Sequence, residues 1–331
     1  MKAFAVVVLA LLAGLFASIV LSQGAPPASE QEAAWMCPMH PDYTMEAEGG
    51  CPRCGMALVR AAPFDVRDYR LDFRTEPAVV KPGERARLFF TIFHPGTNEL
   101  IRTFTVVHEK PYHLFLIGQD LTHFEHIHPE QMPDGTWSID VTLPKAGYYK
   151  VLSDFVPGGG AAQLIARPLV TAGYDGDLMG DSARLVADTS LTKTVDDVTA
   201  TLSFDPPTFV AGLYGHLSYR LTDTATRRPI SDLQPYLGAF GHTLVISEDA
   251  VSYVHAHPLN IRDVPDDGGL PVFLIPPGAD LENLRGGPDV TFDGLIPKPG
   301  RYRAWTQFRR NDKVYTFAFT FEAVAATEAR Q

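Results

Sequence analysis

Histidines recur at one spacing in two places of this chain of 331 residues. The pattern His-x12-His-x-His occurs twice with an offset of 129, as His113, His126 and His128 and again as His242, His255 and His257. Alternate residues of a strand point to the same face, so each His-x-His pair places two imidazoles side by side. Because imidazole is a good ligand for copper, zinc and nickel, the spacing predicts two metal sites with three histidines each.

A hairpin is expected to bring the third histidine of each set to the other two. A four-residue loop at Gly118–Leu121 pairs His113 with His126, and a loop at Ser247–Ala250 does the same in the second set. Directly opposed residues have Cβ atoms roughly 5 Å apart, close enough for imidazoles to share an ion. The alternative is a structural set of histidines that hydrogen-bond to the backbone at a strand end.

Other polar residues near these sets are given structural roles. Asp120 and Asp249 lie at the loop tips, where an aspartate favours turn formation. His94, His108 and His216 stand alone in the sequence, and we interpret them as surface or hydrogen-bonded histidines.

All three cysteines lie in one short segment, the cysteine module at residues 35–60. Two C-x-x-[CH] turns, about ten residues apart, can close a tetrahedral metal site because each tight turn presents two ligands to one ion. Methionine thioethers beside thiolates favour a soft ion such as Cu(I). The candidate ligands of the module are Cys37, His40, Cys51, Cys54, Met39 and Met56.

The cysteine module resembles the heavy-metal-binding domain of copper-exporting P-type ATPases and of periplasmic adaptor subunits of heavy-metal efflux pumps. The family pattern is C-P-M-H-P, a short spacer and C-P-x-C-G-M-x-L, which residues 37–41 and 51–58 reproduce. Gly49 and Gly50 stand where the family usually carries Pro-Gly. The resemblance implies binding of copper, silver or zinc, and efflux-pump components as partners. It leaves open which of Cys, His and Met ligate the ion.

Short alternating apolar runs in two copies of one unit predict a mainly β fold, with a β-sandwich of Ig-like or cupredoxin-like type in each copy. Late in the unit the offset between copies grows from 129 to 153, which places an insertion near Arg262–Pro288. The expected strands are Arg87–Phe93, Tyr112–Ile117, Thr136–Leu143, Tyr148–Phe155, Gln163–Thr171, Gly215–Leu221, His242–Ile246, Val251–His255, Arg301–Phe308 and Val314–Phe321. More weakly, the D-L-x-x-F-x-H-x-H-P segment resembles YtkA-like extracytoplasmic sandwiches.

Lys2 followed by the apolar run Ala3–Leu21 predicts a secretory signal peptide or an uncleaved membrane anchor. The rest of the chain is therefore expected outside the cytoplasm, in the periplasm or secreted, with membrane contact only through this segment. The expected parts are the leader 1–22, a flexible tether 23–34, the cysteine module 35–60, copy one 66–173, a linker 174–198, copy two 199–324 and a tail 325–331.

The composition narrows the function. A net charge of −11, from 28 basic and 39 acidic residues, disfavours a nucleic-acid partner. A blue-copper centre needs a thiolate, and no cysteine follows Cys54.

We expect a binding protein rather than an enzyme. The leading hypothesis is an exported protein that sequesters or hands over metal, with Cu(I) at the cysteine module and Cu(II) or zinc at the histidines. The alternative is a zinc-stabilised adaptor of an envelope metal-efflux assembly.

Overall fold

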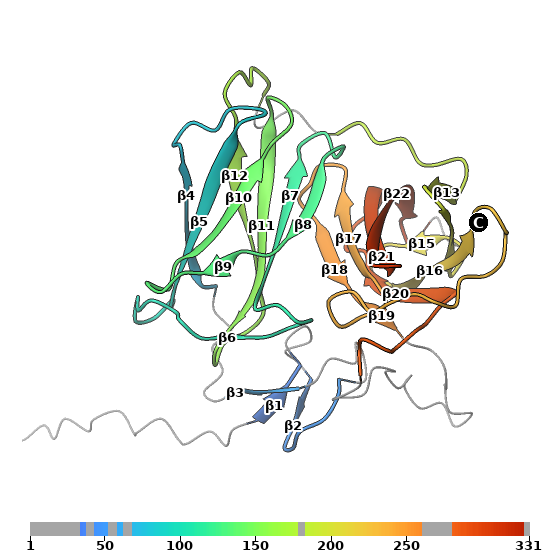
Figure 1. Cartoon of the computed structure of the whole chain (residues 1–331), viewed down its shortest axis with the longest axis horizontal. Coiled ribbons are helices and arrows are strands. Elements are labelled where there is room, and N and C mark those ends of the chain that lie inside the picture. The colour runs from blue at the N-terminus through green and yellow to red at the C-terminus, as the bar shows by residue number, and fades with distance from the viewer. Residues whose placement is uncertain are drawn as a thin grey trace, which may run out of the picture. The chain divides into compact units, whose positions relative to one another are not determined.

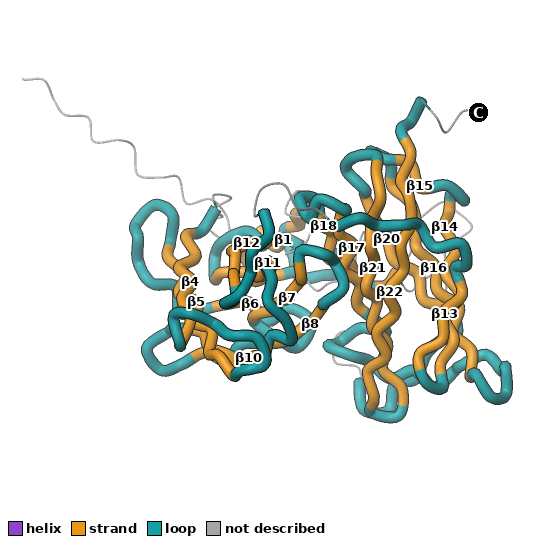
Figure 2. Tube along the Cα trace, turned by 90° about the horizontal axis from the view of Figure 1, so that it is seen from above, coloured by secondary structure: helices purple, strands orange, loops and turns teal. Residues whose placement is uncertain are grey.

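The structure is a computed structural model that describes residues 34–37, 43–51, 58–61, 68–177, 183–259 and 280–327. All regular structure in these residues is strand, which confirms the mainly β fold (Figure 2). The predicted leader, nearly all of the tether and most of the predicted insertion lie outside the described residues. Within the described part, no helix has the length and hydropathy needed to cross a membrane.

The cysteine module contributes a small sheet of three strands in the order β2-β1-β3 (Figure 1). The strands are β1 (Ala34–Met36), β2 (Thr44–Met45) and β3 (Val59–Ala61). Cys37 directly follows β1, and Cys51 lies between β2 and β3. The two cysteines form a small buried cluster with Leu58. Such a segment is too short to build a large core of its own, which is typical of modules stabilised by a metal.

Copy one is a sandwich of two antiparallel sheets. Its core lies between them and includes Phe90, Tyr112, Trp137 and Tyr149. One sheet has the order β4-β5-β10-β9, with β4 (Arg70–Glu76), β5 (Arg85–Phe93), β10 (Trp137–Thr142) and β9 (Glu130–Gln131). The other has the order β12-β11-β7-β8, with β12 (Gln163–Val170), β11 (Tyr148–Pro157), β7 (Tyr112–Gly118) and β8 (Phe124–Ile127), and β6 (Phe104–Thr105) pairs with β11.

Copy two repeats this plan around a second core that includes Tyr219, Phe292, Phe308 and Phe319. One sheet has the order β13-β14-β16-β20-β19, with β13 (Thr192–Val195), β14 (Val198–Asp205), β16 (Tyr214–Asp223), β20 (Asp289–Leu295) and β19 (Pro258–Leu259). The other has the order β15-β22-β21-β17-β18, with β15 (Phe209–Val210), β22 (Lys313–Val324), β21 (Gly300–Arg310), β17 (His242–Ser247) and β18 (Tyr253–Ala256).

Each of the ten expected strands overlaps an observed one. Of the strands with seven residues or more, β4, β14 and β20 were not predicted; their exposed faces carry charged or hydroxyl side chains that interrupt the apolar runs. The shorter strands β1, β2, β3, β6, β9, β13, β15 and β19 were not predicted either. The expected linker also ends too late, since β13 lies inside it and β14 begins at Val198.

The two copies pack through the sheets that contain β7 and β17. Every residue of these two strands is buried, because their own sandwich covers one face and the other copy covers the second. Figures 1 and 2 show the sheet of β7 and β8 in copy one facing the sheet of β17 and β18 in copy two. Between them lies an apolar cluster drawn from both copies, in which Phe124 stacks on Trp305 at a ring-centroid distance of 4.8 Å.

Equivalent contacts cross this interface in both directions. Lys150 of β11 donates to the Ala250 carbonyl at the tip of the β17–β18 hairpin. Arg303 of β21, which corresponds to Lys150 in the repeat, donates to the Leu121 carbonyl of the β7–β8 hairpin at 3.0 Å. Contacts that map onto one another under exchange of two similar units define an approximate two-fold interface. The repeat therefore places equivalent strand ends of the two copies opposite each other.

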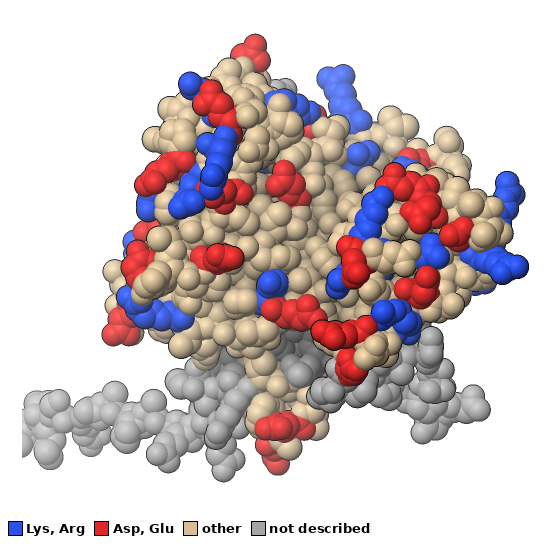
Figure 3. All heavy atoms as spheres, in the orientation of Figure 1, with Lys and Arg blue, Asp and Glu red and all other residues tan. Residues whose placement is uncertain are grey.

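Charged side chains of both signs cover the face drawn in Figure 3. Lys and Arg are interspersed with Asp and Glu there, and no basic patch forms on this face.

Candidate metal centre

The hairpins that carry the histidines have a different register from the expected one. In copy one, Phe115 rather than His113 lies opposite His126, and in copy two Leu244 lies opposite His255. The predicted pairing is therefore wrong by two residues in both copies. Side chains alternate with a period of two, so this shift leaves the histidines on the face that was expected.

The loop explains the shift. The Gly118 amide donates to the His123 carbonyl at 3.1 Å, so the strands pair one residue further and the four-residue loop is Gln119–Thr122. Within it Leu121 has a left-handed backbone, with φ of 55°. A left-handed backbone conformation at leucine is difficult to predict from sequence, because glycine and asparagine are the residues that usually adopt it.

Three histidines of copy one converge at one end of the hairpin. One ring nitrogen of each lies within 4.8 Å of a nitrogen of the other two. The ring centroids of His113 and His128 are 4.9 Å apart, as are those of His126 and His128. We call His113, His126 and His128 the copy-one triad. The structure thus brings these three predicted residues together.

The protons on two of these rings are fixed by their neighbours. The Val107 carbonyl can only accept, so His113 donates to it through Nε2–H at 3.0 Å. His126 donates through Nδ1–H to Gln307 Oε1 at 3.0 Å, and the Gln307 amide nitrogen donates to Thr316. A neutral imidazole has one N–H, so His113 Nδ1 and His126 Nε2 both present lone pairs, and they lie 3.1 Å apart. Two facing lone pairs at this distance repel each other, and a cation bound by both nitrogens would satisfy them.

A second triad combines the two copies. One nitrogen each of His108, His242 and His257 lies within 4.8 Å of the others, and we call this the cross-copy triad. His108 comes from copy one and stacks on His257 of copy two, with ring centroids 3.6 Å apart. His108 was interpreted as an isolated histidine, and that interpretation is wrong. Its counterpart in copy two is Leu237, so the repeat itself marks His108 as a difference between the copies.

The other two isolated histidines do have local structural partners. His94 Nδ1 accepts from the backbone amide of Gly96 at 3.1 Å, within its own turn. His216 forms an ion pair with Asp293, with 2.5 Å between Nδ1 and Oδ1. Neither belongs to the two triads.

His255 lies between the triads and is held by a carboxylate. Its Nδ1 donates to Asp154 Oδ2 at 2.7 Å across the copy interface. Asp154 and Gln307 occupy equivalent positions in the repeat, so each copy supplies the residue that orients a histidine of the other. A carboxylate behind an imidazole fixes its tautomer and raises its basicity toward a metal. Sequence reasoning missed both residues, although each directly precedes the aligned Phe155 or Phe308.

The two triads and His255 together are called the histidine centre below, and burial keeps the rings of the two triads uncharged. Desolvation lowers the pKa of His108 to about 3 and of His113 to about 4, and repulsion from neighbouring histidines adds to both shifts. His128 follows with a pKa of about 3, for the same reasons. The same causes hold the pKa well below its ordinary value at His126, His242 and His257. These rings are neutral at pH 7, the state that binds metal.

Several imidazole nitrogens of the centre are buried without a hydrogen-bond partner among the described residues. Buried polar atoms are normally paired, and an unpaired group asks for an explanation such as an ion. Neutral nitrogens grouped in threes, within 4.8 Å of one another, suit a transition-metal ion of borderline softness. The unpaired atoms are His108 Nε2, His128 Nε2, His242 Nδ1, His255 Nε2 and His257 Nε2.

Only part of the predicted cysteine site can be placed. Cys37 and Cys51 are both fully buried and lie in one cluster. Met36, a neighbour in β1, is also buried. The other four candidate ligands, His40, Cys54, Met39 and Met56, lie outside the described residues.

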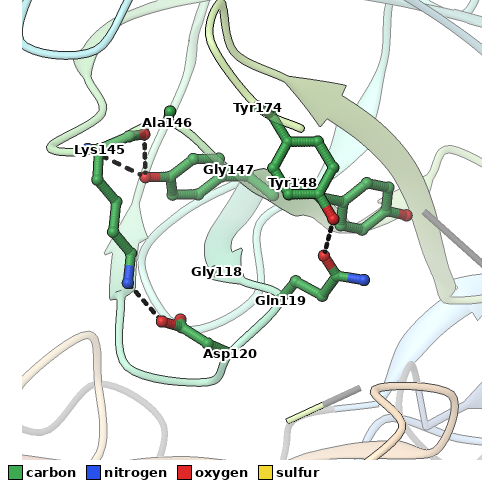
Figure 4. Close-up of a pocket in the computed structure, with 9 residues that line it drawn as sticks. Gly118, Gln119, Asp120, Lys145, Ala146, Gly147, Tyr148 and Tyr174 are labelled. Carbon is green, nitrogen blue, oxygen red and sulfur yellow. Dashed lines mark hydrogen bonds and ion pairs between the residues drawn. The ribbon is translucent and has the colours of Figure 1, made fainter. Parts of the chain in front are cut away.

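A pocket of about 310 Å³ lies at the other end of β7, away from the histidines (Figure 4). Lys145 pairs with Asp120 there, and the Tyr174 hydroxyl donates to Gln119 at 2.7 Å. In copy two the equivalent pair is Lys298 and Asp249, at 2.5 Å. These pairs tie the hairpin tip to the next turn, as expected for turn aspartates.

The body of the chain matches the family model described as "Domain of unknown function (DUF8832)" at residues 65–169 and 193–325. The matched residues make up more than half of the chain. The chain belongs to the DUF8832 family. Both histidine triads of this DUF8832 protein lie within the matched residues. The weaker resemblance to YtkA-like sandwiches stays a prediction.

Residues 34–61 match the family model described as "Heavy metal binding domain". This confirms the resemblance stated for the cysteine module, with nearly the same boundaries. The DUF8832 protein therefore carries a heavy-metal-binding domain, and its histidine triads have the geometry to hold metal as well.

Comparison with known proteins adds little beyond these two families. No curated protein matches the chain. Among solved structures, the adhesin FdeC of Escherichia coli is 13% identical, with a TM-score of 0.24, and the match covers 81% of this chain and 68% of that one. The adhesin InvE of Yersinia pseudotuberculosis is 10% identical, with a TM-score of 0.23 and coverage of 77% and 60%. At these TM-scores the likeness carries no functional argument.

Proposed function

We propose that this protein is an extracytoplasmic heavy-metal-binding protein that captures copper, or a similar ion, and sequesters it or hands it over. The observation that carries this proposal is the pair of lone pairs on His113 and His126, buried and 3.1 Å apart. Neutral rings fixed in these tautomers gain little from remaining metal-free, whereas a cation between them satisfies both. The heavy-metal-binding domain at the start of the chain supports the same function.

The ligand chemistry favours copper over zinc or silver as the ion that both parts share. Imidazole suits Cu(II), zinc and nickel, while thiolates and thioethers suit Cu(I), silver and zinc. Copper fits the histidines as Cu(II) and the cysteine module as Cu(I). Zinc also fits both donor sets and ranks second.

The role proposed is binding rather than catalysis. Asp154, the carboxylate hydrogen-bonded to the histidine centre, already accepts the Nδ1–H of His255 and is not disposed as a general base. Export is supported by the apolar segment after Lys2. Efflux-pump components are the proposed partners, on the family resemblance of the cysteine module.

The test is metal loading followed by X-ray absorption, which separates nitrogen from sulfur ligands. Metal-free full-length protein is loaded with Cu(II), with Cu(I) under anaerobic conditions, and with Zn(II). We expect a nitrogen shell that disappears in the double variant His113→Ala/His242→Ala and persists when Cys37, Cys51 and Cys54 are changed to Ser. A wild-type protein that binds only through sulfur would contradict the proposed role of the histidines and favour the zinc-stabilised adaptor.

A further inference from the structure

One tight turn contacts both parts of the protein that are proposed to hold metal. The junction turn, Val107–Lys110, precedes β7 and is closed by backbone hydrogen bonds in both directions, at 3.0 and 3.1 Å. Its two central residues, His108 and Glu109, have φ of 48° and 65°. Such a turn normally carries Asn or Gly at these positions, so two bulkier residues here cost conformational energy.

The first residue of this turn packs against the cysteine module. The Val107 side chain lies against the buried cluster of Cys37, Cys51 and Leu58. The Val107 carbonyl, on the other side, accepts the Nε2–H of His113. One residue therefore contacts the thiol cluster through its side chain and the copy-one triad through its backbone.

The second residue of the turn is a ligand of the cross-copy triad. His108 stacks on His257, and its Nε2 is buried without a hydrogen-bond partner among the described residues. Copy two has the same turn, with Leu237 at φ of 53° and Gly238 at φ of 72°. The backbone geometry of this turn is therefore shared by both copies. Only in copy one does the turn carry a histidine, His108, beside a residue that contacts the thiol cluster, Val107.

We propose that His108 is the transfer ligand that passes a soft monovalent ion, Cu(I) or Ag(I), from the histidine centre to Cys37 and Cys51. This inference rests on the proposed function, because it requires that both parts bind metal. Val107 packs against the cluster that contains both thiols, and the next residue in the chain is His108, a member of the cross-copy triad. The direction follows from softness, since thiolates bind monovalent copper and silver better than imidazole does.

The step is a ligand exchange without a change of oxidation state. Metal–nitrogen bonds break as metal–sulfur bonds form, and each cysteine thiol that becomes a ligand releases its proton to solvent. No oxidant or reductant is required.

Anaerobic stopped-flow mixing of metal-free full-length protein with one equivalent of Cu(I), supplied as its acetonitrile complex, tests the transfer. The near-ultraviolet absorption of Cu(I)–thiolate bonds reports arrival at the cysteines. Ions that first reach the histidines give a slow phase, and we expect its rate to be independent of protein concentration because the transfer is intramolecular. A rate proportional to protein concentration would overturn the proposal.

A matched pair of valine variants isolates the docking contact. Val107→Ser weakens the packing on the thiol cluster and should lower the rate constant of the slow phase by about tenfold. That factor corresponds to a loss of about 1.4 kcal/mol of apolar contact. Val106→Ser makes the same change on a neighbouring side chain that is 62% exposed, and should leave the rate unchanged. The final absorption should be the same in both variants, because no ligand is altered. Equal rates in the two variants would overturn the proposal.

His108→Leu, which copies the residue of copy two, tests the transfer ligand itself. We expect a slow phase at least as retarded as that of Val107→Ser, with Cu(I) capture by the thiols intact. Direct loading with Zn(II), followed by X-ray absorption to detect nitrogen ligands, distinguishes a failure of the proposed function from a failure of the transfer proposal. If no ion binds to nitrogen, the proposed function fails. If ions bind to nitrogen but neither Val107→Ser nor His108→Leu slows the transfer, only this inference fails.

Discussion

Copy one builds its triad from a single hairpin, whereas copy two borrows a histidine from its neighbour. In copy one, His113 Nδ1 and His126 Nε2 lie 3.1 Å apart. In copy two, the equivalent nitrogens of His242 and His255 are both without a partner among the described residues, and the ring centroids are 5.8 Å apart, against 5.3 Å for His113 and His126. The position beside His242 is taken instead by His108, which enters from copy one.

This difference separates a local site from an interfacial one. The copy-one triad depends on the register of one hairpin, while the cross-copy triad depends on the packing of two sandwiches. An ion in the cross-copy triad binds groups of both copies and so stabilises their contact by the free energy of binding. We therefore expect the copy-one triad to tolerate changes at the interface better than the cross-copy triad does.

The largest expected effect comes from removing one ligand of either triad. His113→Ala should remove the nitrogen-bound ion of the copy-one triad, and His242→Ala that of the cross-copy triad. Loss of a direct ligand should weaken binding by more than the roughly 10–100-fold typical of an outer partner. Competition with a chelator of known affinity measures each site.

The two single variants also test whether the triads are independent. Each should leave the other triad within a few-fold of its wild-type affinity, and the double variant should lose both ions. If either single variant abolishes both nitrogen-bound ions, the triads form one cooperative site and the comparison drawn above is wrong.

A reciprocal exchange sharpens the comparison further. His108→Leu makes the turn of copy one like that of copy two, and should lower the number of nitrogen-bound ions by one. Leu237→His places an imidazole at the equivalent position of copy two, which should strengthen binding at the copy-one triad. Metal content after gel filtration measures the stoichiometry. An unchanged ion count in His108→Leu would exclude His108 as a ligand.

The copy-one triad could be predicted from the sequence because its three histidines lie close together in the chain and depend on one hairpin. Strand alternation places His126 and His128 on one face, and an error of two residues in register does no harm when the side-chain period is two. The cross-copy triad depends on long-range packing. Nothing near His108 in the sequence shows that its turn faces His257, and Asp154 and Gln307 act only across the interface.

The fold was predictable for a similar reason. Strands with apolar residues on both faces, such as β7 and β17, are evident as continuous runs in the sequence. Whether the two sandwiches pack together could not be predicted, because it depends on long-range contacts. The strands β4, β14 and β20 carry polar residues on an exposed face and gave weaker patterns.

A smaller effect is expected from the residues that orient the histidines. Asp154→Asn replaces the carboxylate behind His255 by an amide, as Gln307 already provides behind His126. We expect metal affinity near His255 to fall by about tenfold, the lower end for outer partners. Gln307→Glu makes the reverse change and should raise affinity at the copy-one triad. If both variants bind like wild type, the carboxylate and amide are equivalent and His255 takes no part in binding.

A change in stability rather than in metal binding is expected for the metal-free protein in mild acid. The folded pKa of His108 and His113, about 3 and about 4, lies below the value near 6.5 expected for an unfolded imidazole. The unfolded chain therefore binds protons first as pH falls, and stability declines between about pH 6.5 and about pH 3. Above about pH 6.5 both states are neutral, and stability should not depend on these groups. Urea unfolding of chelator-treated protein at several pH values measures the decline, and His108→Leu should make it shallower because one neutral imidazole is gone. An equally steep decline in that variant would mean that His108 is already protonated, or freely solvated, in the folded protein.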